Sequence, residues 1–138
     1  PTPVGFGEAG RGHLVRAAIE ATAYAIRANL EQVQNVAGRR AADVALGGGM
    51  ARTEAFVSAL ADVLGRRMWV ARAGAAPATG AFWCAAAATG VVESLDDAAL
   101  RARGALATVE PDPRRTAEYD ERYRRWSDLG RRVRDLEL

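Results

Sequence analysis

The chain is built around Asp43-Val44-Ala45-Leu46-Gly47-Gly48-Gly49-Met50-Ala51-Arg52-Thr53. Here a short apolar run meets three consecutive glycines, and a helical pattern begins directly after them. Because glycine has no Cβ, the backbone can turn tightly and approach a ligand closely. The helix that follows points unpaired N–H groups, and the positive end of its dipole, toward the glycines. Two interpretations stay open from this stretch alone: a seat for a phosphate or nucleotide, and a tight strand-to-helix turn without a ligand.

The composition indicates an ordinary globular domain and excludes several kinds of catalytic and metal-binding site. The 138 residues are 49% hydrophobic and 26% charged, with a formal net charge of +2, which suits one domain with a modest core. All 19 basic residues are arginine, so the chain offers neither a P-loop lysine nor a Schiff-base lysine. Cys84 and His13 are each the only residue of their type, which excludes a disulfide, a CxxC or two-histidine metal site and a Ser-His-Asp triad within the chain. We therefore name no catalytic residue and no metal ligand.

Arginines near the end of the chain alternate with acidic residues. The basic pairs Arg114-Arg115, Arg124-Arg125 and Arg131-Arg132 lie among these acids: Glu118, Asp120, Glu121, Asp128 and Asp135. We interpret this pattern as a solvated helix face rather than a nucleic-acid interface. No apolar run is long enough to span a membrane and no signal-peptide pattern opens the chain, so we expect no membrane partner and a reducing, cytoplasmic location. The sequence does not fix the oligomeric state and is compatible with a homodimer.

The first third of the chain predicts a loop and then a long helix. Pro1–Arg11 is rich in Gly and Pro and begins without Met, so we expect a loop and a piece of a longer protein. A helix is predicted over Gly12–Ala37, with Gly38 as its C′ residue. We expect His13 to be structural or exposed. Apolar residues at helical spacing predict one buried face: Leu14, Val15, Ala18, Ile19, Thr22, Ile26, Leu30, Val33 and Val36.

The middle of the chain predicts a strand, a helix and a second strand. The strands are expected at Ala42–Leu46 and Arg67–Arg72, with Met68 and Val70 on one face of the second. The helix between them runs from Thr53, a good N-cap, to Leu64, and Gly65 ends it. Its apolar stripe is Phe56, Val57, Leu60, Val63 and Leu64. This is a βαβ-like unit, whose connection should be right-handed if the strands are parallel.

The remainder predicts three helices. The first follows Pro77 over Ala78–Thr89, and we expect Phe82 and Trp83 to supply bulk and Cys84 to lie within the packing. The second runs from Ser94, as N-cap in a capping box with Asp97, to about Arg103. Residues 104–110 are expected to form a connector. The last helix is expected from Asp112-Pro113 to about Asp135, with a narrow apolar seam: Tyr119, Tyr123, Trp126, Leu129, Val133 and Leu136.

This order of elements favours an α/β fold with few strands and several packed helices. Two strands cannot complete a sheet, so we expect further strands upstream in the natural protein. Asp62 and Glu54 are carboxylates close to the glycine turn in sequence. We expect Asp62, eight residues into its helix, to make a structural contact rather than to act as a base.

The sequence resembles the FGGY carbohydrate kinases, which include xylulokinases, gluconokinases and autoinducer-2 kinases. The resemblance covers nearly the whole chain and is carried, in order, by these pieces: His13–Glu20, Ala25–Arg27 and Asn29-Leu30; Leu46–Thr53, Phe56 and Leu60–Gly65; Thr79–Ala81 and Ala85–Gly90; and Pro111–Pro113 with Tyr119–Trp126. It implies that residues 1–138 are the C-terminal portion of the nucleotide-binding, C-terminal domain. It also implies a partial ribonuclease H-like fold of the actin-type ATPases.

The resemblance further implies a nucleotide site and the parts that complete it. Gly47, Gly48, Gly49 and Met50 would line the adenosine and α-phosphate of ATP, Thr53 would offer its hydroxyl, and Gly80 would pack near the adenine. The aspartate base, the sugar site, the phosphate-gripping loops and most of the Mg²⁺ binding would belong to other parts of the natural protein.

Two functions follow as hypotheses. In the first, the chain is the ATP-binding part of a kinase that transfers the γ-phosphate of ATP to a sugar hydroxyl, and it is inactive by itself. In the second, it is a non-catalytic actin-like interaction module that has lost the kinase activity. The upstream sequence would distinguish them, because only a kinase needs the aspartate base and the phosphate loops.

Overall fold

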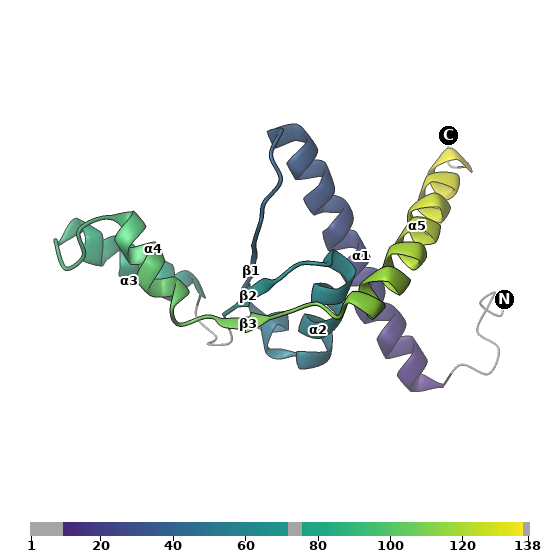
Figure 1. Ribbon diagram of the computed structural model, residues 1–138, viewed down its shortest axis with the longest axis horizontal. Helices are drawn as coiled ribbons and strands as arrows, with labels where there is room; N and C mark the ends of the chain where they lie inside the picture. Colours follow the sequence, from purple (N-terminus) through teal and green to yellow (C-terminus); the bar gives the residue numbers. More distant parts are fainter. Residues whose placement is uncertain (1–9, 72–75, 137–138) are drawn as a thin grey trace.

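A computed structural model of the chain describes residues 10–71 and 76–136 and shows a mixed α/β architecture (Figure 1). Residues 1–9 of the expected N-terminal loop, and residues 72–75 after the second strand, lie outside the described part. The elements in chain order are α1 (Arg11–Ala37), β1 (Val44–Leu46), the short 3₁₀ turn η1 (Gly49–Arg52), α2 (Glu54–Leu64), β2 (Met68–Val70), α3 (Ala76–Ala88), α4 (Leu95–Arg103), β3 (Ala107–Val109) and α5 (Pro113–Leu136).

The strands form one three-stranded sheet in the order β1-β2-β3. β1 and β2 are parallel and joined through α2, which confirms the predicted βαβ-like unit. β3 pairs antiparallel with β2, with Trp69 opposite Thr108. The prediction of a connector over residues 104–110 was therefore wrong. β3 forms because β2 offers it backbone partners, and such pairing with a distant strand does not show in a local sequence pattern.

The main core lies between one face of this sheet and the helices α1, α2 and α5. The predicted stripe of α2 is buried there, except for the half-buried Leu64, and it packs with Met68 and Val70 of β2. Ala45, Trp69 and Thr108 share a register on the opposite face, since side chains alternate along a strand. Ala45 and Thr108 are exposed on that face and Trp69 is half-buried. The sheet is thus covered by the main core on one side only.

The predicted apolar stripe of α1 is half-covered near the middle of the helix and exposed toward both ends. Ile19, Thr22, Ile26 and Leu30 are half-buried, whereas Leu14, Val15, Ala18, Val33 and Val36 are exposed. The residues of α1 that are buried, Ala23 and Tyr24, were not among the predicted ones. The prediction that the whole stripe lines a buried face was therefore wrong. The 27 residues of α1 span about 40 Å and the 11 residues of α2 only about 16 Å, so α2 cannot cover both ends of the longer helix.

The seam of α5 is likewise buried at one end. Tyr119 and Tyr123 are buried and Trp126 is half-buried, but Leu129 and Val133 are exposed. The predicted seam holds for the first half of the helix and fails for these two residues, which lie beyond the helices that pack against it. The side chain of Leu136 lies outside the described part of the chain.

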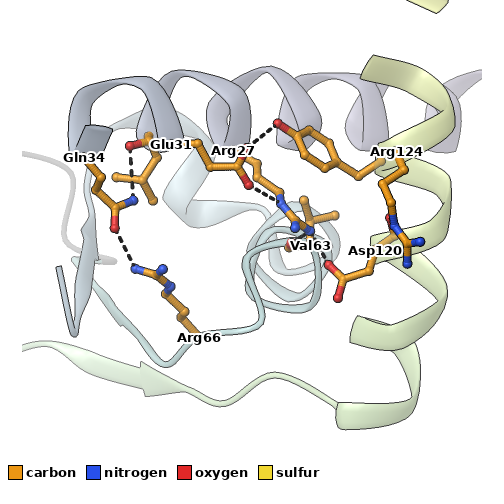
Figure 2. A network of polar contacts seen from close by, with 9 residues as sticks. Arg27, Glu31, Gln34, Val63, Arg66, Asp120 and Arg124 are labelled. Atoms are coloured by element: carbon orange, nitrogen blue, oxygen red, sulfur yellow. Dashed lines mark hydrogen bonds and ion pairs between the residues drawn. The ribbon is translucent and has the colours of Figure 1, made fainter. Parts of the chain in front are cut away.

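Arg27 joins the three helices of the main core. Its guanidinium donates to Glu31 of α1 at 2.9 Å, to the carbonyl of Val63 in α2 at 2.9 Å and to Asp120 of α5 at 2.5 Å. Figure 2 shows Arg27 at the centre of this network, between α1, α2 and α5. Burial lowers the pKa of Arg27, but the hydrogen bonds that it donates to Asp120 and Glu31 outweigh the effect of burial, and the net shift of the pKa is upward. The Arg27 side chain therefore remains charged and links the three helices through its hydrogen bonds.

The pair α3–α4 packs on itself. Ala86, Val92 and Ala98 form a small core that is separate from the core around α2. Ser94 caps α4 by accepting from the N–H of Asp97 at 3.1 Å, as predicted. Cys84 and Phe82 are exposed, so the prediction that Cys84 lies within the packing was wrong. Small residues let α3 approach α4 closely, but only along the narrow face that meets α4.

No helix among the described residues is long and apolar enough to cross a membrane.

Candidate functional site

The glycine turn, Gly47–Gly49, leaves the carboxyl end of β1. Gly48 has φ 97° and ψ −172°, a backbone conformation that is essentially restricted to glycine. The 3₁₀ turn η1 begins at the next residue, and the N–H of Ala51 donates to the carbonyl of Gly48 at 3.2 Å. The sharp change of direction from strand to helix therefore depends on this one glycine.

The surface of the turn is open. Within residues 10–71 and 76–136, no atom outside the neighbouring residues lies within 4 Å of the position that a Cβ would take at Gly48 or at Gly49. All three glycines are exposed, and the side chain of Met50 beside them is 46% exposed. Packing within the described chain therefore gives no reason for the missing side chain at Gly49, and the backbone is left accessible to a ligand.

Thr53 begins α2 as its N-cap, as predicted. Its carbonyl accepts the N–H of Val57 at 3.0 Å, which starts the helix. Its hydroxyl makes no capping hydrogen bond, although threonine usually uses the hydroxyl in that way at an N-cap. The Thr53 side chain therefore does not cap the first N–H groups of α2. These groups stand at the N-terminus of the helix, directly after the glycine turn.

Gly80 lies on α3 beside a mostly apolar hollow of about 490 Å³. Six of the residues that line it are Ala71, Thr79, Gly80, Trp83, Ala102 and Leu106. They come from the end of β2, from α3, and from α4 with the turn after it. No atom of the described residues lies within 4 Å of a Cβ built at Gly80, so packing among those residues leaves room for a side chain there.

Topology places the glycine turn and the hollow at one edge of the sheet. β1 and β2 are parallel, so their carboxyl ends meet at the same edge, where open α/β sheets bind ligands. The N–H of Ala71, which lines the hollow, donates to the carbonyl of Leu46 directly before the turn at 2.9 Å. β3 is antiparallel and starts at this edge, so the end of α4 is brought there as well.

The structure places the predicted residues in two neighbouring groups rather than in one pocket. Gly47–Met50 and Thr53 are exposed at the turn and at the start of α2, whereas Gly80 lies in the hollow, which none of those residues lines. The sequence missed the contribution of α4 and the turn after it, including Ala102, Arg103 and Leu106. No motif marks these residues, and only the pairing of β3 with β2 brings them to the site.

Asp62 is structural, as predicted. It is 2% exposed, and its carboxylate accepts the N–H of Asp112 at 2.8 Å. Arg115 Nε lies 3.1 Å from its other oxygen, at ion-pair distance but without hydrogen-bond alignment. His13 is also structural, because its Nδ1 accepts the N–H of Gly10 at 3.2 Å at the start of α1. Both side chains are thus engaged away from the glycine turn.

Metal-ligating side chains do not gather at this edge. Among residues 10–71 and 76–136, no group of three or more His, Cys, Asp or Glu side chains is placed to hold a metal ion. The described site therefore offers backbone groups, a hydroxyl and an apolar hollow. That set can bind and orient a ligand.

Comparison with known proteins gives the family of the chain. Residues 5–89 match the family described as "FGGY family of carbohydrate kinases, C-terminal domain". The chain belongs to the FGGY family. The resemblance stated from the sequence is thereby confirmed, and the glycine turn, α2 and α3 all fall within the matched residues.

Individual FGGY relatives cover most of the chain. It is 37% identical over 118 residues to the glycerol kinase of Acidiphilium cryptum, covering 84% of the chain and 23% of that protein. It is 36% identical over 89 residues to the glycerol kinase of Methylorubrum extorquens, covering 64% of the chain and 18% of that protein. The chain therefore spans about a quarter or less of the length of these relatives.

A solved structure supports the same FGGY assignment. The xylulose kinase of Rhodospirillum rubrum superposes with a TM-score of 0.74 at 27% identity, over 93% of this chain and 26% of that one. The predicted partial α/β fold of the ribonuclease H-like, actin-type class is confirmed by this likeness, and β3, α4 and α5 extend the chain beyond the residues matched by the family.

Proposed function

We propose that this chain is the C-terminal portion of the nucleotide-binding domain, residues 1–138, of an ATP-dependent carbohydrate kinase. The observation that carries the proposal is the exposed glycine turn, which has glycine-only backbone at Gly48 and the uncapped N-terminus of α2 directly behind it. Backbone N–H groups and a helix N-terminus are a favourable seat for phosphate. Relatives named glycerol kinase and xylulose kinase support the reaction class.

The residues present fit an adenine nucleotide. Gly47, Gly48, Gly49 and Met50 would lie against the adenosine and α-phosphate, and the hydroxyl of Thr53, which makes no capping hydrogen bond, would hydrogen-bond to the nucleotide. The apolar hollow beside Gly80 has a volume within the usual range for small-molecule sites and would take the flat base. The bound nucleotide would supply the phosphoryl group.

The contribution of this chain to the reaction would be positioning. Phosphoryl transfer depends mainly on alignment and charge stabilisation. By holding the nucleotide at its adenosine end, this chain would contribute to the alignment. The base, the acceptor site and most Mg²⁺ contacts would come from other parts of the natural protein. The acceptor would be a sugar or polyol hydroxyl, and the 138 residues alone should show no turnover of ATP with any pentose, hexose or glycerol.

Gly48→Val in the natural protein tests the site. A side chain at φ 97° strains the backbone by roughly 1–3 kcal/mol, and the branched side chain would also stand where the nucleotide approaches. We expect the ATP KM to rise about tenfold or more and the acceptor KM to change little, measured by steady-state kinetics with glycerol and D-xylulose among the acceptors.

Gly38→Ala is the matched control. Gly38 also has a positive φ, 63°, and open space around it, but it lies at the far end of α1. The Gly38→Ala variant should have a lower free energy of unfolding than the unmodified protein and the same ATP KM. An equal rise of the ATP and acceptor KM values in Gly48→Val would count against the site, and a natural protein that binds no ATP would favour the non-catalytic module.

A further inference from the structure

The α3–α4 pair determines where the hollow lies. The pair has a small core of its own, and Figure 1 shows it projecting from the sheet, away from α1 and α5. It also carries Gly80 and most of the walls of the hollow. The position of the hollow relative to the glycine turn therefore depends on how the pair is attached to the sheet.

Arg103, the last residue of α4, makes that attachment. Its Nη2 donates to Asp43 Oδ2 at 2.5 Å, and its guanidinium carbon lies 4.9 Å from the centre of the Trp69 ring. Within residues 10–71 and 76–136, no other hydrogen bond or ion pair of a side chain joins α3 or α4 to the strands or to the residues that flank them.

Strand geometry explains how one side chain reaches both partners. Asp43 and Ala45 are two residues apart and so lie on one face of the strand, and the register places Ala45 opposite Trp69. This is the face that the main core leaves open. Arg103 also lines the hollow, so its side chain runs from the hollow along the open face to the residue that precedes β1.

We propose that Arg103 is a positioning residue for nucleotide binding, which holds the α3–α4 pair and its hollow in register with the strand that leads into the glycine turn. This inference rests on the proposed function. Arg103 and Asp43 keep 49% and 40% of their side-chain surface exposed, so their ion pair contributes little to global stability. Its loss should loosen the α3–α4 pair and leave the main core folded.

Arg103→Ala in the natural protein tests this role. We expect the ATP KM to rise about five- to twentyfold, the acceptor KM and kcat to stay within about threefold, and amide hydrogen exchange to accelerate over residues 76–103 and not in α2. Asp43→Ala should have the same effect, and the double variant should be little worse than either single variant, because both remove one interaction. The charge exchange Arg103→Asp with Asp43→Arg should recover part of the affinity.

Arg67→Ala is the matched control. Arg67 pairs with Glu110 at the other end of the sheet, with 54% and 58% of the two side chains exposed, and it takes no part in the proposed site. The Arg67→Ala variant should have the same ATP KM as the unmodified protein, and the same amide hydrogen-exchange rates over residues 76–103.

The outcomes separate the two proposals. If the unmodified protein does not bind ATP, the proposed function fails. If it binds ATP but Arg103→Ala behaves like Arg67→Ala, or the double variant shows the product of the two single effects, the role of Arg103 is overturned. If Arg103→Ala unfolds, the charge-exchange variant is the test instead. Recovery of ATP affinity in that variant supports the role of Arg103 in positioning, and a folded variant without such recovery overturns it.

Discussion

Gly48 and Gly49 are adjacent but lack side chains for different physical reasons. The backbone of Gly48 has a conformation that other residues reach only with strain, so the fold itself requires glycine there. Gly49 has no positive φ and open space where a Cβ would stand, so neither backbone strain nor packing within the described chain excludes a side chain. In the proposed site, the close approach of the nucleotide would make use of the missing side chain at Gly49.

Tyr123 should make the stability of the chain sensitive to alkaline pH. Burial, and then a hydrogen bond donated to Glu31 at 2.8 Å, raise the pKa of Tyr123 to about 12, although Arg27 over its ring opposes the shift. The folded state therefore keeps this proton to higher pH than the unfolded chain, whose tyrosine pKa is about 10. Its contribution is complete below about pH 10 and is lost as the pH rises toward 12.

Urea unfolding at pH 9 and at pH 11 measures this loss. Tyr123→Phe removes the titrating group, so its free energy of unfolding should fall less between the two pH values than that of the unmodified chain. Tyr24 has a raised pKa as well, mainly through burial, so the variant should keep part of the dependence. Identical pH dependence in both proteins would contradict the role of Tyr123.

At the scale of elements, packing follows helix length. α2 is short and buried, and it serves as the centre on which the long helices α1 and α5 lie. Both long helices extend beyond α2, and their exposed apolar residues stand on those extensions. Polar contacts then fix the crossings, with Arg27 joining three helices and Asp62 of α2 holding the start of α5.

Asp62→Ala should be destabilising through the loss of this anchor. The variant removes the acceptor of the Asp112 N–H and leaves Arg115 without its buried partner. We expect a loss of about 2–3 kcal/mol in the free energy of unfolding, because hydrogen bonds to charged groups are worth about 1.5–3 kcal/mol. The measurement is urea denaturation at neutral pH.

Arg115→Ala is the control for Asp62→Ala. The Arg115 side chain is 44% exposed, so its half of the ion pair is screened and should be worth less than about 1 kcal/mol. A loss as large as that of Asp62→Ala would mean that the ion pair, and not the Asp112 contact, anchors α5.

The whole molecule exposes more surface than a chain of its mass usually does. The accessible surface is 10106 Å², whereas a compact monomer of 14.7 kDa has roughly 6,900 Å². Large apolar side chains contribute on the extensions of the long helices: Leu14, Val15, Val33, Val36, Leu129 and Val133. The open face of the sheet adds to the same excess. Such surface is what further protein would cover.

The isolated 138 residues should therefore self-associate. Exposed apolar surface of this extent favours association, so the weight-average mass in sedimentation equilibrium should rise with concentration. Replacing both Val33 and Val36 by glutamate should weaken the association, because these residues are 63% and 86% exposed and the fold does not need them apolar. A monomer of constant mass at all concentrations would contradict this expectation.

The amino-acid sequence by itself determined the local structure of this chain. A few neighbouring residues determine each of these features: the stripe of α2, the N-cap position of Thr53, the side-chain cap at Ser94, and the left-handed glycines at Gly38 and Gly65. Helical periodicity and capping act over three to four residues, so a local pattern is enough to predict them. The family was recognisable for a related reason, since its motifs are contiguous.

Only the tertiary structure decided which parts of those elements are buried and what surrounds the glycine turn. β3, the hollow beside Gly80 and the contact of Arg103 with Asp43 depend on residues that are distant in sequence, and Arg103 and Asp43 are separated by sixty positions. The exposure of Cys84 and of the ends of α1 depends on how far the neighbouring helices reach. Periodicity shows which side of a helix is apolar, but the length and position of the packing partner decide how much of that side is covered.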